Sequence, residues 1–450
     1  MKKRGCFLCI MLAVLFAVLP SGCGSPKETG GKLTVCADGN GLNEMYLGPI
    51  LAEFQSIYPD IELEVVYLPP ANMQDSAMSE ERSAALTRTR TELMGGEGAD
   101  IYLFFNRASE NYDSYMLFPN LERQIMGGVF CDLEFLFDSA DFDAEAYIPS
   151  LREAGTYEGK SYILPLSYTC PVLIAAEEGL AGSGFDEDAA AAGTSDYIEQ
   201  LMALPEEKRP YLGVVLPSLL MNAPTASPVS VQEADIRLDL PVWQETLAQA
   251  KRIAEEGGGS EEDFLAAMDL NTCIQGGAAV LAGAAVDPGY SLRMIEDGGS
   301  TARLLPIPNE NGGLTMMPCI TAAVSSGCKN TGAAADLLLF LLGDTVQGSG
   351  ILESSGSAAN LIGGGTSWPV RRGCAEKMLE NLTIQPIQPG KISDTLKADL
   401  RHMEERADAC RLAGRYDGEL YLLTEPYLNG ETSWEECYAR IEKEWSYLDE

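Results

Sequence analysis

The feature that most constrains the fold is a regular alternation of strand and helix patterns that begins after residue 31. Short apolar or alternating runs predict strands over 33–37, 61–65 and 101–105. Between them, apolar residues at helical spacing predict helices over 47–57 and 80–94. Strands and helices that alternate at these distances are typical of parallel α/β layers.

The same alternation returns later in the chain, which is too long for one small core. A length of 450 residues predicts two or three domains, at about 100–200 residues per domain. Hydrophobic residues make up 46% of the chain, so it is globular rather than disordered. Further strands are expected over 162–164, 171–175 and 278–281, and helices over 242–256, 333–342, 375–379 and 397–412.

The first 23 residues have the pattern of an export signal. A basic stretch over 2–4 precedes an apolar run over 7–19, which is too short to span a membrane as a mature helix. The small residues before Cys23 resemble a bacterial lipobox, which implies cleavage before Cys23 and attachment of lipid to its thiol. Pro20 stands where that pattern has leucine, so a plain secretory signal is the alternative. Either signal places the mature chain outside the cytoplasm.

The composition is strongly acidic, with a net charge of −36. Loss of the three basic residues of the leader takes this charge to −39. A negative field of this size argues against nucleic acid as a partner and against broad contact with anionic lipid. It would attract a cationic solute, although a charge that maintains solubility explains it equally well.

Cysteine usage is unusual for an exported chain. Nine of the twelve cysteines lie beyond Cys23, at irregular gaps and without a C-x-x-C pair. Neither a disulfide framework nor a zinc site fits this pattern. Several lie in apolar runs, such as Cys36 and Cys319, where a thiol packs as a small hydrophobic group. We therefore expect mostly reduced, buried thiols.

Five segments, in order along the chain, resemble the motifs of a single protein family. Residues 54–65 (FQSIYPDIELEV) resemble the family's F-x-x-x-Y-P-x-I-x-V element, and 98–101 (GADI) resemble its G-x-D-V strand opening. Residues 159–165 (GKSYILP) resemble G-K-x-Y-x-L-P, and 369–372 (PVRR) resemble a late P-V-R element. Residues 275–280 (QGGAAV) resemble x-x-G-K-A-A-M, with glycine in place of the usual lysine. Five motifs in the correct order make the chain similar to the extracellular solute-binding proteins of ABC importers (family 1), whose maltose-binding branch matches best by segment order.

This resemblance implies an α/β, two-lobed, periplasmic-binding-protein-like fold with hinge strands and a ligand cleft between the lobes. The implied layout is a lipoprotein signal peptide over 1–22, a flexible tether over 23–31, a first lobe of 32–164 plus 314–347, and a second lobe of 165–313 plus 348–450.

The resemblance also implies a function. The protein would be anchored by lipid to the cell membrane, on its extracytoplasmic face, and would capture a small solute by lobe closure. In this branch the solute is an oligosaccharide, and it is delivered to ABC permease subunits. The implied protein is a monomer without a cofactor. Two alternatives remain open: a cationic solute such as a polyamine or basic peptide, and a sensing or adhesion lipoprotein of the same fold.

Polar residues that follow predicted strands are candidates for ligand contact, because ligands of parallel α/β lobes bind beyond the carboxyl ends of strands. Asp38 and Asn40 follow the first strand, and Asn106 and Arg107 follow the third, where the family often contacts its ligand. Their side chains would form hydrogen bonds to a polar solute. Turn formation, or exposure in a solvated loop, is the alternative role for these residues.

Three aromatic residues are candidates for stacking against a ligand. Tyr168 lies just after the first expected crossing between lobes, and Tyr290 follows the strand expected over 278–281. Trp368 lies before the late P-V-R element, close to the cleft in the family's order. An aromatic ring offers apolar area together with a polar group, which suits a sugar or a cation. Ordinary core packing is the alternative for each.

Catalysis and metal binding find little support. The only histidine, His402, lies in a charged helical stretch, and no common hydrolase or P-loop motif occurs. A pair of carboxylates could still serve a glycosidase, although none stands out. Residues 141–145 have the first spacings of a calcium loop, but Ala146 replaces the glycine expected next. The sequence therefore favours a binding protein without a metal.

The cysteine pattern makes a direct prediction. Thiol titration of the mature protein in denaturant should count most of the nine cysteines as free, because their spacing suits neither disulfides nor a metal. A count showing that most are oxidised would contradict the reduced-thiol interpretation.

Overall fold

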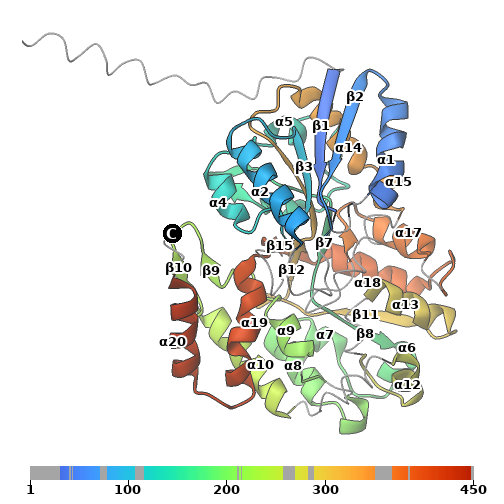
Figure 1. Cartoon of the computed structure of the whole chain (residues 1–450). Coiled ribbons are helices and arrows are strands. Elements are labelled where there is room, and N and C mark those ends of the chain that lie inside the picture. Colours follow the sequence, from blue (N-terminus) through green and yellow to red (C-terminus); the bar gives the residue numbers. More distant parts are fainter. Residues whose placement is uncertain are drawn as a thin grey trace, which may run out of the picture.

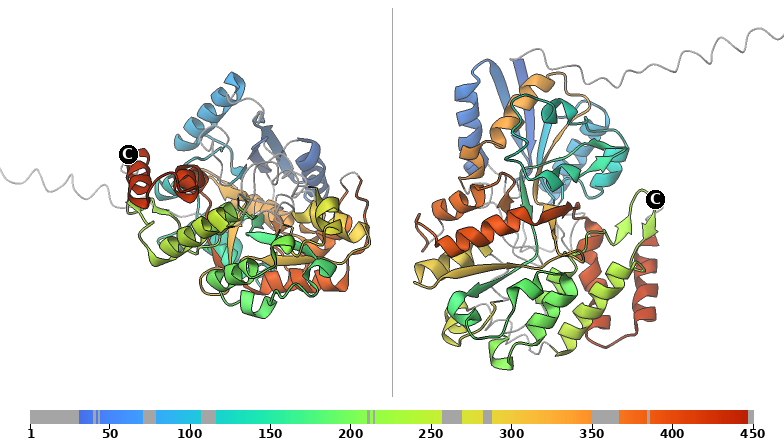
Figure 2. Two further views of the ribbon diagram at one scale, coloured as in Figure 1. Left: turned by 90° about the horizontal axis from the view of Figure 1, so that it is seen from below. Right: turned by 180° about the vertical axis from the view of Figure 1, so that it is seen from behind.

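The computed structural model describes residues 31–39, 42, 44–70, 79–106, 116–209, 212–213, 215–256, 269–281, 288–349, 367–383 and 386–446. Figure 1 shows that these residues form two bodies, each with helices packed against strands. The two further views in Figure 2 show the same division, with the C-terminal helices along one side of the second body. No helix of the described residues is long and apolar enough to cross a membrane.

The first lobe is built on a five-stranded sheet in the order β2-β1-β3-β13-β6. Strand β1 pairs in parallel with β2 and β3, and β13 pairs antiparallel with β3 and β6. The strands are β1 (Gly31–Ala37), β2 (Ile61–Tyr67), β3 (Ile101–Phe105), β6 (Leu164–Pro165) and β13 (Ile320–Val324).

Helices cover both faces of this sheet because its central strands are apolar on both faces. Leu33 and Val35 belong to one buried cluster with α1 and α14, whereas Cys36 and Phe104 belong to another with α2 and α4. Three layers result, with cores above and below the sheet. The helices of this lobe are α1 (Glu44–Ile57), α2 (Glu80–Met94), α4 (Leu121–Met126), α5 (Glu134–Phe137), α14 (Thr331–Leu341) and α15 (Asp344–Gln347).

The second lobe packs helices around the antiparallel pair β8 (Val172–Ala176) and β11 (Ala302–Pro306). Its own buried cluster surrounds Trp243, which is fully buried. The helices are α6 (Glu177–Leu180), α7 (Glu187–Ala190), α8 (Thr194–Met202), α9 (Val215–Leu220), α10 (Pro241–Glu256), α12 (Leu270–Gln275), α13 (Pro288–Asp297), α17 (Cys374–Asn381), α18 (Asp394–Glu405), α19 (Arg415–Leu428) and α20 (Trp434–Glu444). Smaller elements of the second lobe are η2 (Glu206–Lys208), β9 (Val229–Ser230) and β10 (Asp235–Ile236), whereas η1 (Pro149–Glu153), β4 (Thr156–Tyr157) and β5 (Lys160–Ser161) belong to the first lobe.

Between the lobes lies a small hinge sheet in the order β14-β7-β12-β15. The chain passes through it three times: from β6 through β7 to β8, from β11 through β12 to β13, and from α15 through β14 to α17. This arrangement confirms the predicted two-lobed α/β fold with hinge strands, whereas the exact lobe boundaries stay a prediction. The hinge strands are β7 (Ser167–Thr169), β12 (Leu314–Pro318), β14 (Trp368–Pro369) and β15 (Ala407–Cys410).

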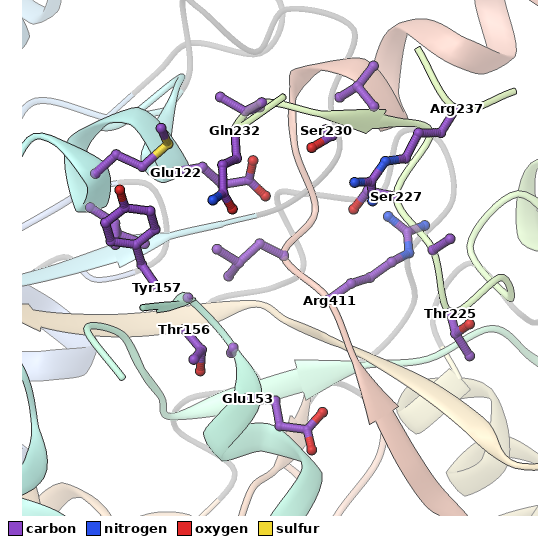
Figure 3. Close-up of a pocket in the computed structure, with 18 residues that line it drawn as sticks. Glu122, Glu153, Thr156, Tyr157, Thr225, Ser227, Ser230, Gln232, Arg237 and Arg411 are labelled. Atoms are coloured by element: carbon purple, nitrogen blue, oxygen red, sulfur yellow. The ribbon is translucent and has the colours of Figure 1, made fainter. Parts of the chain in front are cut away.

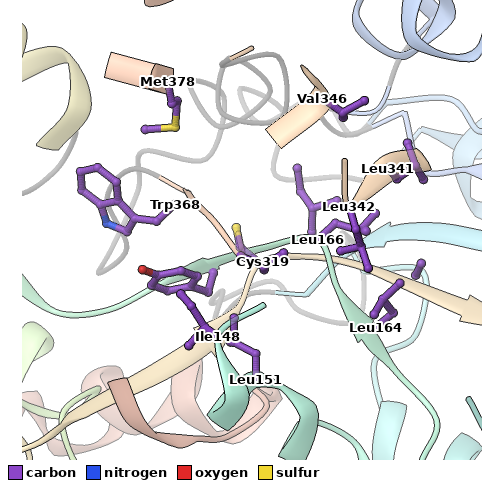
Figure 4. Close-up of a cluster of buried hydrophobic side chains, with 14 of the residues drawn as sticks. Ile148, Leu151, Leu164, Leu166, Cys319, Leu341, Leu342, Val346, Trp368 and Met378 are labelled. Carbon is purple, nitrogen blue, oxygen red and sulfur yellow. The ribbon is translucent and has the colours of Figure 1, made fainter. Parts of the chain in front are cut away.

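Buried side chains tie the three crossings together. The Ser167 hydroxyl lies 2.5 Å from that of Ser367 and accepts the N–H of Ile320 at 3.0 Å. The Gln347 amide donates to the carbonyl of Leu166 at 3.1 Å and accepts the N–H of Val370 at 2.9 Å. Apolar side chains fill the space around these bonds (Figure 4). The crossings are therefore bonded to one another as well as to the lobes.

Two predicted elements were wrong, and the strand predicted over 162–164 begins only at Leu164, as β6. Residues 278–281 are buried but form no strand; the N–H of Leu281 donates to Ile174 in β8 at 2.7 Å. The helix expected over 397–412 ends at Glu405, and the chain continues as β15. Pairing with β12 overrides the weak strand propensity of this Ala- and Asp-containing segment.

The described cysteines include eight free thiols, five of them buried and three half-buried. Burial raises the pKa of Cys36 and of Cys170 to about 12, so both remain protonated and unreactive. Cys131 is not one of these free thiols, and the redox state of the cysteines in the protein stays a prediction.

A buried carboxylate caps helix α17. The backbone N–H of Gly373 donates to the two oxygens of Glu404, on α18, at 3.1 and 3.0 Å. Burial raises the pKa of Glu404 to about 7, against the lowering effect of this N–H and of Arg372. The folded protein therefore favours the protonated form of Glu404.

This raised pKa predicts a pH-dependent stability. Glu404 contributes stability that is fully present below its ordinary pKa of 4.5 and is lost as the pH rises through about 7. Each pH unit corresponds to about 1.4 kcal/mol, so the loss is on the order of 3 kcal/mol. Urea unfolding of the wild type and of Glu404→Gln between pH 4.5 and 7.5 should show the steeper decline in the wild type. Parallel curves would contradict this assignment.

Candidate functional site

A cavity of about 330 Å³ lies where the two lobes face each other (Figure 3). One wall comes from the first lobe, over 122–126 and 153–157, and the other comes from the second lobe, over 225–237. Arg411 and Leu412, directly after β15, complete the lining beside the hinge sheet. A solute in this cavity would contact both lobes and the hinge.

The first-lobe wall follows from the local structure of α4 and of the β4–β5 hairpin. Leu121 and Ile125 are one turn apart and buried in the first lobe, so the neighbouring Glu122 is directed to the cavity. In the hairpin, Glu158 and Gly159 have φ of 50° and 77°, as a tight two-residue turn requires. This turn places Tyr157 at the edge of the cavity.

The second-lobe wall is a polar loop held by hydrogen bonds. The indole N–H of Trp243 donates to the carbonyl of Ser227 at 3.3 Å, and the Thr225 hydroxyl donates to the carboxylate of Glu310. The Ser230 hydroxyl accepts the N–H of Glu233 at 3.2 Å. These bonds fix a row of hydroxyl groups along the cavity.

Two arginines line the cavity, and each has a partner within its own region. The guanidinium of Arg411 is almost fully buried; it donates to Asp417 and to the carbonyls of Pro224 and Met221. Arg237 forms an ion pair with Glu233 at 2.7 Å. Arg411 therefore joins β15 to the second-lobe loop, and each of its three guanidinium nitrogens donates one hydrogen bond.

Glu122 is the unusual group of this site. Burial raises its pKa to about 7; Asp417 adds to the rise, and Arg237 and Arg411 oppose it. The described residues contain no hydrogen-bond donor to its side chain. The oxygens of this side chain can accept hydrogen bonds from donors on a solute.

The lining as a whole suits polar recognition. It combines hydroxyl groups, an amide at Gln232, carboxylates and a single aromatic ring, supplied by both lobes. A solute that bridges these groups favours the closed arrangement of the lobes. Among the described residues no group of three or more His, Cys, Asp or Glu side chains could hold a metal ion.

The polar residues predicted after β1 and β3 lie at the expected strand ends but are buried. Asp38 is fully buried and forms an ion pair with Arg82, also fully buried, with N–O distances of 2.9 and 3.3 Å. The Asn106 amide donates to the carbonyl of Pro318 in the hinge sheet at 3.3 Å. Asn40 and Arg107 lie outside the described residues, as does the expected anchor Cys23.

The structure brings two of the predicted aromatic residues together. Tyr168 and Trp368 are register partners in the hinge sheet, and both are fully buried. Within the described ranges, neither the Tyr168 hydroxyl nor the Trp368 N–H has a hydrogen-bond partner. Tyr290 is half-buried near the start of α13. None of the five described candidates lines the cavity of Figure 3, so their binding roles stay predictions.

Sequence reasoning missed the groups that line the cavity. Glu122 lies in no recognisable motif, and Arg411 was assigned to a helix that ends before it. The segment over 224–228 (PTASP) was the one available signal, because small polar residues between prolines indicate a loop.

Comparisons with known proteins place this geometry in context. No protein-family model and no curated protein matches the sequence. Among solved structures, an extracellular solute-binding protein family 1 from Alicyclobacillus acidocaldarius matches 94% of this chain and 100% of its own, with a TM-score of 0.61 and 14% identity. The sugar-binding protein MalE from Xanthomonas citri covers 93% and 97%, with a TM-score of 0.59 and 13% identity. This chain has the fold of the family 1 extracellular solute-binding proteins.

A third structure, the cyclic alpha-maltosyl-1,6-maltose binding protein from Arthrobacter globiformis, shares this solute-binding-protein fold. It matches 93% of this chain and 99% of its own, with a TM-score of 0.56 and 12% identity. The solute-binding-protein fold thus covers both lobes and the hinge rather than one domain.

The buried pair of Asp38 and Arg82 predicts a large effect on stability. Asp38→Asn leaves the Arg82 charge buried without its partner, so the free energy of unfolding should fall by about 3–5 kcal/mol. Glu64→Gln is the matched control, because it breaks the ion pair of Lys32 and Glu64, whose side chains are 56% and 52% exposed. Urea unfolding should show no measurable change for this control. Equal effects of the two variants would contradict a stabilising role for the buried pair.

Proposed function

We propose that the protein captures a carbohydrate, an oligosaccharide, between its lobes and delivers it to the permease of an ABC transporter. The observation that carries this proposal is the polar cavity, which both lobes line beside a hinge sheet of three crossings. Such a cavity can be completed or opened by lobe rotation, and binding energy from both walls favours closure.

Two observations favour a carbohydrate as the solute. Hydroxyl, amide and carboxylate groups line the cavity, and these groups pair with the hydroxyl groups of a sugar. Several proteins of the same fold are named for sugars, including a Listeria monocytogenes substrate-binding protein in complex with cycloalternan. A cationic solute is the second candidate, because carboxylates line the same cavity.

The predicted hinge aromatics belong to this proposal. The Trp368 N–H and the Tyr168 hydroxyl are buried polar groups without a partner among the described residues, a costly state that a ligand group would relieve. Neither these two residues nor Asn106 and Tyr290 line the cavity of Figure 3, so their contact with the solute stays a prediction from the sequence. Asp38 would act indirectly, by holding Arg82 beneath the end of β1.

The location of the protein is part of the same proposal. The leader would direct export, and lipid on Cys23 would hold the protein at the extracytoplasmic face of the cell membrane, where a permease receives solute. A sensing or adhesion lipoprotein would use the same fold and anchor without a permease.

The test is thermal stability of the mature protein with maltooligosaccharides, polyamines and short peptides. A ligand at 100 times its Kd adds about 2.7 kcal/mol to the free energy of unfolding, so the transition temperature should rise with one class of solute. Conversion of a sugar into products would favour an enzyme, and no rise with any class would contradict solute capture.

Two variants test whether the rise in transition temperature comes from binding in the cavity. Ala226→Trp should remove the shift, because a large side chain would fill the space between the walls. Ala84→Trp, on the exposed face of α2, is the matched control and should leave the shift unchanged. A full shift in both variants would exclude the cavity as the site.

A further inference from the structure

The charges around the cavity do not balance. Arg411 is paired with Asp417, and Arg237 is paired with Glu233, so both guanidinium charges are already compensated. Glu122 and Glu153 also line the cavity, and no ion pair within the described ranges involves either of them. With Asp417 and Glu233 counted, four acidic side chains therefore accompany two arginines in and around the cavity.

Glu122 is the better placed of these two acids. It lies in the first turn of α4 and is half-buried, whereas Glu153 is exposed. Figure 3 shows Glu122, Gln232 and Tyr157 on one side of the cavity, with the two arginines on the other. Glu122 thus forms no ion pair with either arginine and lies in a region with an amide and an aromatic ring.

The charged groups that face Glu122 come from three elements. Asp417 belongs to α19, Arg237 follows β10, and Arg411 follows β15. Burial opposes ionisation of Glu122 more strongly than the arginines favour it, which raises its pKa. A positive charge on a bound solute would compensate the negative charge of ionised Glu122, which these arginines do not fully compensate.

We propose that the solute is a carbohydrate that carries a primary amino group, and that its ammonium binds Glu122. This inference rests on the proposed function and specifies the solute of the same site. An ammonium supplies three N–H donors to an acceptor that has none among the described residues, and the Tyr157 ring can contact its charge. The hydroxyl groups of Thr225, Ser227 and Ser230 would bind the sugar hydroxyls.

Protonation supports this assignment. Near neutral pH, Glu122 retains its proton in part of the molecules, since its pKa is raised to about 7. An ammonium favours the ionised carboxylate, so binding should release a proton. A neutral sugar of the same size gives no such release.

The test compares three trisaccharides by isothermal titration calorimetry at pH 7: the glucosamine trimer, its N-acetylated form, and maltotriose. The wild type should bind the glucosamine trimer about tenfold or more tightly than the N-acetylated trimer. Its proton release should appear as an observed enthalpy that changes with the ionisation enthalpy of the buffer. Glu122→Gln should lose this preference and the proton release, while keeping its affinity for the N-acetylated trimer. Glu134→Gln, which changes a first-turn acid of α5 outside the cavity, should behave as the wild type.

The outcomes separate this inference from the proposed function. Equal affinity for the amino and N-acetylated trimers, or an unchanged preference in Glu122→Gln, would overturn the role of the amine while sugar capture stands. Binding of spermidine with no binding of any trisaccharide would contradict a carbohydrate solute, both in the proposed function and in this inference. No binding of sugar or spermidine would overturn solute capture itself.

Discussion

The hinge sheet is the constraint on which the rest of the structure depends. Three crossings share one set of hydrogen bonds, so rotation of one lobe relative to the other must bend all three together. The Gln347 amide and the Ser167 hydroxyl are the groups through which this linkage acts. The cavity lies beside β15, at one edge of this sheet, where a small rotation alters the distance between its walls.

Much of the first lobe could be predicted from the sequence because its elements are strongly periodic. Strand β3 and helix α2 were predicted at the residues where the structure has them. The pattern failed at β15, whose strand state depends on pairing with β12 rather than on its own residues. Arg411 follows that strand, so an error in one element also hid a residue of the cavity.

The sequence could predict where some polar residues of the candidate site lie, but not which side chains interact with them. The end of β1 was the correct place to expect Asp38, yet no pattern shows that Arg82, on α2, pairs with it. Glu122 is likewise an ordinary first-turn acid in the sequence. Its raised pKa comes from burial, to which Asp417 adds and which the two arginines oppose. These three residues lie far along the chain and meet Glu122 only after both lobes have formed.

The crossings also have a consequence for how the chain reaches its native state. Strand β13 pairs with β3, roughly 220 residues earlier in the sequence, and nearly all of the second lobe's β8–β11 region lies between them. The first sheet thus cannot be completed until most of the chain is present, and the loop that must close carries a large entropy cost. Neither lobe is an autonomous folding unit in the order of synthesis. A partial chain that lacks β13 would expose an unpaired edge of β3. Until β13 pairs with it, the environment in which the chain folds decides whether this edge is kept from pairing with other chains.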